Sequence, residues 1–156
     1  DYQLRRTADT LLENASVLLP ETGIRIFGVE IDMDYYKKLR KSVMKVSYLN
    51  SLLGRPCADE YNILLAHNPD YFQTYAGWGA DLVLSGHVHG GIMRLPVLGG
   101  VLSPALRLFP RYDGGLYEEG KSKMVLGRGL GTHTLPIRVF NPGELIVVRL
   151  EPERGN

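Results

Sequence analysis

The sequence has 156 residues, of which 44% are hydrophobic and 22% charged, a composition typical of a globular domain and unlike that of a fibrous or disordered chain. Lysine and arginine number 18 against 17 acidic residues, giving a net charge of +1, so no long-range field would attract nucleic acid. Cys57 is the only cysteine, which excludes a disulfide within the chain and suits a reducing compartment. We therefore expect a single domain over residues 1–156.

The first part of the chain alternates between helical and strand patterns. Apolar residues at helical spacing predict a helix over Asp1–Glu13. Strands are predicted at Val17–Leu19 and Ile24–Ile31, on either side of a turn-like Pro-Glu-Thr-Gly sequence. A second helix is expected from Asp34 to about Leu49, because its apolar residues keep the helical period and an aspartate at position 32 or 34 can cap its start.

Two short, nearly all-apolar segments in the middle of the chain predict buried strands. They are Tyr61–Ala66 and Asp81–Ser85, with a helix expected between them from about Asp70 to Tyr75. Each of these strands is followed by histidine. Because ligand sites in open α/β sheets gather at the carboxyl ends of strands, this repetition is the most informative pattern in the sequence.

The last third of the chain predicts a loop, a hairpin and one more strand. The Gly- and Pro-rich stretch from Gly91 to about Gly115 predicts a long loop, with at most a short helix near Pro104–Leu108. Leu116–Glu118 and Lys123–Leu126 predict a hairpin, and Glu144–Leu150 predicts the last strand. Together with the earlier elements, these predict an α/β fold with flanking helices.

The histidines at the strand ends predict a metal site. His67 follows the first buried strand, and the sequence Gly86-His87-Val88-His89-Gly90-Gly91 follows the second. In an extended segment His87 and His89 would leave the same face about 7 Å apart, while Val88 would point into the packing. Such imidazoles can chelate one ion or hold one ion each of a close pair, and the glycines allow close approach of an ion or substrate.

Other interpretations of these residues remain open. A single histidine after an apolar strand is more often a hydrogen-bonded structural residue than a ligand, and for Asn68 we prefer helix capping to a chemical role. Arg128 lies between glycines and could bind an anionic group, although its loop lacks the spacing and the lysine of a P-loop. His133 is expected to be a surface or loop residue, and Cys57 a bystander.

Four segments carry a resemblance to a known family. The sequence resembles the C-terminal half of a calcineurin-like metallophosphoesterase, and within that family the bacterial subgroup of UDP-2,3-diacylglucosamine pyrophosphatase-like enzymes. The segments that resemble it are Ala66–Asp70, Leu84–Gly91, Arg128–Gly131 and Arg138–Leu145.

The resemblance implies a fold, a cofactor and a reaction. The fold is one half of an α/β/β/α sandwich, a mixed sheet with flanking helices. The cofactor is a pair of divalent ions, Mn, Fe or Zn, with His67 and His87 on one ion and His89 on the other. The reaction is hydrolysis of a phosphoester or pyrophosphate. The substrate-binding candidates are Arg128, Gly90, Gly91 and Asn68.

The sequence also departs from the family. It has no Asp-x-His and no Gly-Asp, and its only Gly-Asn is Gly155-Asn156, whereas the resemblance implies that such segments supply the remaining ligands and the catalytic histidine. We therefore name no catalytic residue and expect a fragment with partial or no metal occupancy and little or no turnover. The missing partner sheet would expose an apolar face, through which copies of the chain could form a homo-oligomer.

Two other functions compete with the phosphohydrolase. One is a non-catalytic structural or interaction module in which the histidines only pack and hydrogen-bond. The other is a mononuclear zinc hydrolase that uses three histidines. The sequence predicts a cytoplasmic protein and leaves open a membrane association at the inner face through a segment upstream of Asp1.

Overall fold

The structure, a computed structural model, describes residues 10–37, 42–90, 93–95, 99–102, 110–131 and 138–151. Its centre is a six-stranded sheet with the strand order β1-β2-β3-β4-β8-β7, and β5 and β6 form a separate two-stranded sheet. The strands are β1 Ala15–Leu19, β2 Ile24–Val29, β3 Tyr61–Ala66, β4 Leu82–Ser85, β5 Met93–Leu95, β6 Gly99–Leu102, β7 Gly115–Glu119 and β8 Ser122–Leu126.

The sheet is mixed, with a parallel centre. The four central strands β2, β3, β4 and β8 run parallel to one another. At the two edges of the sheet, β1 pairs antiparallel with β2 and β7 pairs antiparallel with β8. Parallel central strands are commonly buried, which explains the near-continuous apolar sequence of β3 and β4. The carboxyl ends of β2, β3 and β4 consequently meet at one edge of the sheet.

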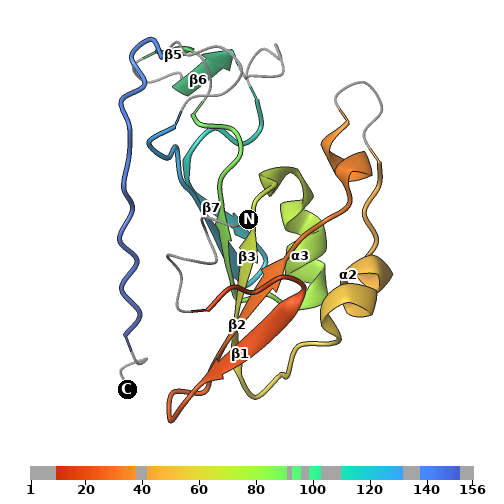
Figure 1. The fold of residues 1–156 in the computed structure, drawn as a ribbon. Helices are drawn as coiled ribbons and strands as arrows, with labels where there is room; N and C mark the ends of the chain where they lie inside the picture. Colours follow the sequence, from red (N-terminus) through yellow and green to blue (C-terminus); the bar gives the residue numbers. More distant parts are fainter. Residues whose placement is uncertain are drawn as a thin grey trace.

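The helices cover one face of this sheet. They are α2 Val46–Leu53, α3 Phe72–Trp78 and two 3₁₀ turns, η1 Met33–Tyr36 and η2 Pro69–Tyr71. Figure 1 shows α2 and α3 on one side of the sheet and the chain after Arg138 on the other. In the described part of the chain no helix has both the length and the apolar character that a membrane crossing requires.

The hydrophobic core lies between the helices and the sheet. The rings of Phe27 and Trp78 meet edge to face, with their centroids 4.9 Å apart. Burial of such large side chains is the main source of stability for a domain of this size. The most deeply buried apolar residues come from four adjacent strands and both helices: Phe27, Leu64, Val83, Met124, Leu49, Phe72 and Tyr75.

The opposite face of the sheet is open. A cavity of about 670 Å³ lies between this face and the extended C-terminal segment. Its apolar lining comes from four sheet strands and from that segment: Val29, Leu65, Leu84, Val125, Ile146 and Val148. Among the described residues, this apolar face is lined by the extended segment and by residues near Leu11, and no second sheet packs on it. This agrees with the expectation that the chain supplies one sheet of a two-sheet fold.

Most predicted strands are confirmed. The first two strands, the two buried strands and the hairpin all form, with differences of at most two residues at their ends. The helix predicted to begin near Asp70 also forms, as η2 followed by α3, and it extends to Trp78. Gly79 ends it with a φ of 116°, a conformation that glycine adopts without strain.

The long helix predicted over residues 34–49 is wrong. η1 ends at Tyr36, Lys37 is extended, and residues 42–45 are not helical, so α2 begins only at Val46. The sequence between the two pieces, Lys37-Lys38-Leu39-Arg40-Lys41, is strongly basic. In a helix its cations would lie three and four residues apart, where like charges repel. The predicted cap is confirmed, since the Asp32 carboxylate accepts a hydrogen bond from Asp34 N–H.

Three further predictions fail within the described residues. The stretch from Gly91 to about Gly115, predicted as a long loop, contains the paired strands β5 and β6. Residues 10–13 are not helical, and the chain at Leu12 crosses β2 so closely that a Cβ at Gly28 would clash with it. Glu144–Leu150 is no strand, because it pairs with none of the described strands. Outside the described residues lie the rest of the first helix, the short helix near Pro104 and two single residues, Gly91 and His133.

Leu64 and Leu65 test whether the two faces of the sheet differ as the structure implies. Leu64→Ala should destabilise the chain by about 2–5 kcal/mol, because it leaves a cavity in the core. Leu65 is 39% exposed, so Leu65→Ala should cost less than about 1 kcal/mol. Urea unfolding of both variants measures the difference. Equal losses would show that the open face is buried in solution.

Candidate functional site

The site begins where two parallel strands end together. Ser85, the last residue of β4, donates its hydroxyl to the backbone carbonyl of His67 at 3.1 Å, and Gly86 N–H donates to the same carbonyl at 3.2 Å. His67 follows β3 directly, so these two bonds join the carboxyl ends of the strands. The histidines that follow the strands are consequently held in one region.

The segment with His87 and His89 is a tight turn and not the extended segment that we expected. Val88 N–H donates to the Gly86 carbonyl at 2.8 Å across His87, whose φ is 70°, and His89 has a φ of 48°. Such three-residue turns with positive φ are rare. The expected alternation of side chains is therefore wrong, although Val88 does pack against the core.

Left-handed backbone at His87 and His89 is itself informative. A non-glycine residue in this region costs about 1 kcal/mol, and such residues cluster at functional sites. The chain must reverse here, immediately after β4, to leave the edge of the sheet. Gly86 and Gly90 flank the turn, and Gly90 is also left-handed with a φ of 73°.

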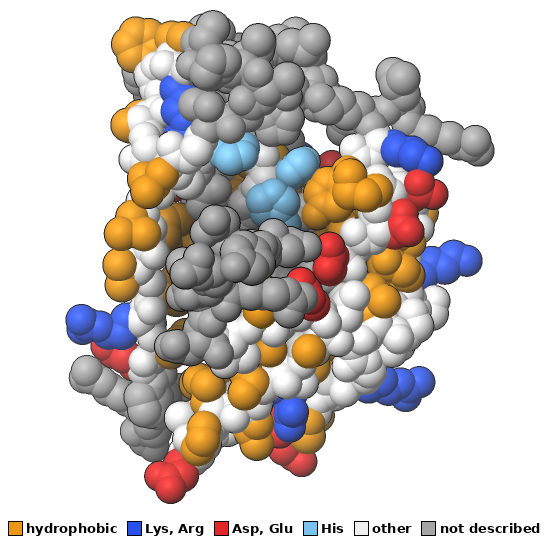
Figure 2. All heavy atoms as spheres, in the orientation of Figure 1, with side chains coloured by type: hydrophobic (Ala, Val, Ile, Leu, Met, Phe, Trp, Pro, Cys, Tyr) orange, Lys and Arg blue, Asp and Glu red, His pale blue; other side chains and the backbone are white. Residues whose placement is uncertain are grey.

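The structure brings two of the three predicted histidines side by side. The ring centroids of His67 and His87 are 5.1 Å apart, with an angle of 75° between the rings. His89 is close enough for its charge to contribute to the lowered pKa of His67. Figure 2 shows the histidine side chains gathered on the upper part of one face, beside a group of hydrophobic side chains.

Burial favours the neutral form of the His67 imidazole. Desolvation is the larger cause that lowers the pKa of His67 below its usual value, and the His89 charge adds to it. A neutral imidazole has a free lone pair for a divalent ion, and the ion then does not compete with a proton. The donor type therefore fits Mn, Fe or Zn, which accept imidazole nitrogen.

The described residues do not supply a complete ligand set. Within the described ranges, no three side chains from histidine, cysteine, aspartate and glutamate form a group that could hold a metal ion. The imidazoles of His67 and His87 carry no negative charge that would offset that of a dication. The described residues at this place thus fit part of a metal site.

Tyr36 is a site residue that the sequence reasoning missed. Tyr36 is the last residue of η1, and its ring packs on that of His87 with the two ring centroids 5.1 Å apart. Burial is the larger cause that raises the pKa of its hydroxyl, and the charge of Glu30 adds to it. The signal was available, because η1 follows β2, whose carboxyl end lies beside that of β3.

Asn68 has the capping role that we preferred. It is 3% exposed, and its side-chain oxygen accepts from Asp70 N–H at 3.0 Å while its amide donates to the Tyr35 carbonyl at 3.2 Å. Both ends of the amide are thus engaged in fixing the start of η2 and the end of η1. These contacts support capping as its role in this chain.

Arg128 already has a carboxylate partner. Its Nη2 donates to Glu144 at 2.7 Å, and its backbone N–H donates to the other oxygen of the same carboxylate at 3.2 Å. The hydrogen bond to Glu144 is the largest cause that raises the pKa of Arg128. An anionic substrate would therefore share this guanidinium with Glu144.

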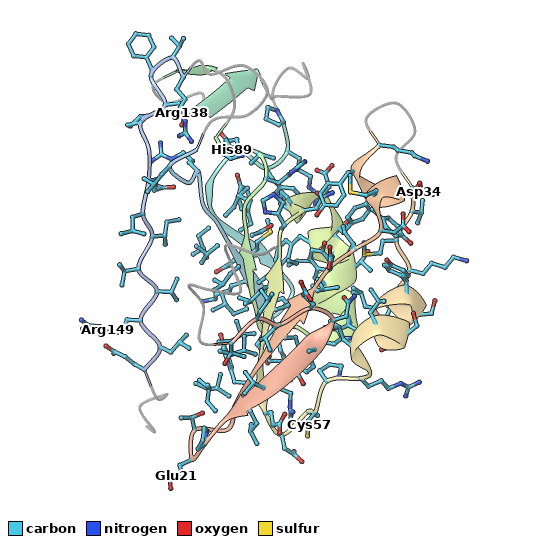
Figure 3. The ribbon with its side chains drawn as sticks, viewed as in Figure 1. Glu21, Asp34, Cys57, His89, Arg138 and Arg149 are labelled. Carbon is cyan, nitrogen blue, oxygen red and sulfur yellow. The ribbon has the colours of Figure 1, made fainter. Side chains whose placement is uncertain are left out.

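Gly90 is explained by packing. A Cβ at Gly90 would lie 2.6 Å from Asn141 Oδ1 and 2.8 Å from Arg128 Cγ and Cδ. No side chain fits between these groups without a shift of the loop. Cys57 lies far from this region, since Figure 3 shows it at the opposite end of the molecule from His89 and Arg138.

Comparison with known proteins finds several relatives that are named metallophosphoesterases. The chain is 31% identical to an uncharacterized metallophosphoesterase of Helicobacter pylori over 92% of its own length and 36% of the relative. It is 35% identical to the metallophosphoesterase YkuE of Bacillus subtilis over 58% of its length and 31% of that protein. The chain is a metallophosphoesterase homologue. No family model matches the sequence, and no solved structure matches it.

The expected subgroup is also found among the relatives. The UDP-2,3-diacylglucosamine pyrophosphatase LpxG of Chlamydia muridarum is 30% identical over 94% of this chain and 43% of its own length. The chain therefore spans less than half the length of each of these three relatives. Its mixed sheet with helices on one face agrees with one half of the metallophosphoesterase fold.

Gly90 can be tested against a second glycine with similar backbone. Gly129 has a φ of 60° but nothing within 4 Å of the place that an added Cβ would take, whereas Gly90 faces Asn141 and Arg128. Both alanine variants should lose about 1 kcal/mol to backbone strain. Gly90→Ala should lose a further 1–3 kcal/mol or so, because the site is overpacked. Thermal or urea unfolding measures both variants, and equal losses would contradict the close packing at Gly90.

Proposed function

We propose that the protein containing this chain hydrolyses phosphoester or pyrophosphate bonds with divalent metal ions, and that residues 1–156 form the C-terminal part of its catalytic domain. One observation carries the proposal. The joined ends of β3 and β4 place the His67 and His87 rings 5.1 Å apart in a chain related to metallophosphoesterases.

The histidines are proposed as the ligands. His67 and His87 would hold one ion and His89 the other. Divalent ions of this kind polarise phosphoryl oxygens and lower the pKa of bound water. The chain's own contribution is to favour neutral His67 by burial and to pack the Tyr36 ring against that of His87.

The substrate side of the proposal concerns the glycine-flanked turn and the arginine. Gly90 and Gly91 would let a phosphoryl group approach the histidines, and Arg128 would contact its negative charge while still bound to Glu144. Asn68 would contact the substrate while its side-chain oxygen caps η2. The names of two relatives, phosphodiesterase YaeI of Escherichia coli and the pyrophosphatase LpxG, support a phosphodiester or pyrophosphate substrate.

The 156-residue chain alone is proposed to be weakly metallated and nearly inactive. Its described residues bring together no group of three ligands, and two neutral imidazoles bind a dication weakly without a carboxylate. This also argues against a mononuclear zinc site built on the three histidines. The open apolar face would favour self-association of the isolated chain.

Hydrolysis of bis(p-nitrophenyl) phosphate by the full-length protein tests the function. Loss of outer-shell partners costs about 10–100-fold in metal affinity or activity, so His87→Ala should reduce Mn²⁺-stimulated turnover by more than about 100-fold. Cys57→Ala, at the other end of the sheet, should leave it unchanged. Chelation by EDTA should abolish turnover, and Mn²⁺ should restore it.

The same measurements separate the rival functions. Turnover that survives chelation would contradict a metal-dependent hydrolase. One tightly held zinc with full activity would favour the mononuclear enzyme. Absence of both bound metal and hydrolysis in the full-length protein would favour a non-catalytic module.

A further inference from the structure

The backbone of His89 is held by a side chain from a distant part of the chain. Asn141 donates from Nδ2 to the His89 carbonyl at 2.7 Å, across 52 positions of sequence. The Asn141 side chain is buried, with 2% exposure. His89 has a left-handed φ of 48°, and such a conformation persists only where the surroundings fix it.

The backbone conformation of Phe140, the residue before Asn141, directs the Asn141 side chain inward. Phe140 has a φ of 52° although it is not glycine, and its own side chain is 75% exposed. The left-handed backbone therefore gains no burial for Phe140. What it achieves is to turn the next residue, Asn141, toward the loop that carries His89.

Arg138 and Glu144 fix the segment on either side of Asn141. Arg138 donates to the carbonyls of Arg128 and Gly129, at 3.1 and 3.2 Å, and to that of Gly131. Glu144 binds Arg128 through its carboxylate and donates its backbone N–H to Gly129 at 3.1 Å. Residues 138–144 are thus tied at both ends to residues 128–131, with Asn141 in the middle.

We propose that Asn141 is a positioning residue that fixes the His89 peptide, and through it the imidazole that would hold the second metal ion. This inference rests on the proposed function. Three features converge on the same peptide: the left-handed His89, the Asn141 amide on its carbonyl, and the close contact of Asn141 with Gly90. Without the amide, the strained peptide is free to relax and carry the ring with it.

The test compares two buried asparagines in the full-length protein. Asn141→Leu removes the amide at nearly constant volume. The matched control is Asn62→Leu, since Asn62 is 3% exposed and donates to the carbonyls of Cys57 and Glu60, near the beginning of β3. Both variants should be destabilised, because each loses hydrogen bonds made by a buried side-chain amide.

Metal binding should separate the two variants. In a Mn²⁺ titration followed by the electron paramagnetic resonance of free Mn²⁺, Asn141→Leu should weaken one of two bound ions by about 10–100-fold and leave the other unchanged. Asn62→Leu should bind both ions as the wild type does. If Asn141→Leu folds poorly, Asn141→Ser replaces it, because serine places no bulk against Gly90. Asn141→Ser should then show the same weakening of one Mn²⁺ ion, by about 10–100-fold.

Each other outcome overturns the inference. Wild-type Mn²⁺ binding in a destabilised Asn141→Leu would reduce Asn141 to a stabilising contact. Equal weakening in the Asn62 and Asn141 variants would indicate general loosening. If the wild-type protein binds no Mn²⁺ and hydrolyses nothing, the proposed function fails as well, whereas an active wild type with insensitive variants removes only the role of Asn141.

Discussion

Parallel pairing of β2, β3 and β4 is the constraint on which the candidate site depends. Parallel strands end at the same edge of a sheet, so the residues that follow them must share that edge. Here these are Tyr36 after β2, His67 after β3 and His87 after β4. The His67 carbonyl, bound by both Ser85 and Gly86, converts this proximity into a fixed arrangement of rings.

The sequence was most informative where burial alone decides the structure. The apolar segments at 61–66 and 81–85 predicted buried strands, and both form central strands of the sheet with their helix-facing residues buried. The failures have two different causes. The helical period continues through 34–49, but like charges three and four residues apart disfavour a helix there. The apolar sequence Glu144–Leu150 predicted a strand, but strand pairing depends on residues distant in sequence, and this segment pairs with none of the described strands.

The site was predictable in its location and less so in its detail. Histidine after each of two buried strands placed His67 and His87 in one region, and the structure confirms that closeness. Spacing alone could not reveal that His87 and His89 are left-handed, because this follows from the reversal of the chain between two glycines. Nor could it reveal the contact between His89 and Asn141, which lie 52 positions apart.

The open face of the sheet and the incomplete ligand set are two aspects of one feature. The cavity between the sheet and the C-terminal segment is lined by Leu65 and Val125 along the sheet and by His67, Ser85 and Gly86 at the strand ends. Any structure that covers these apolar residues must therefore also approach His67. Burial of that face would lower the local dielectric around His67 and strengthen its interaction with a charged partner. Under the proposed function, covering the apolar face and completing the metal site would accordingly be coupled.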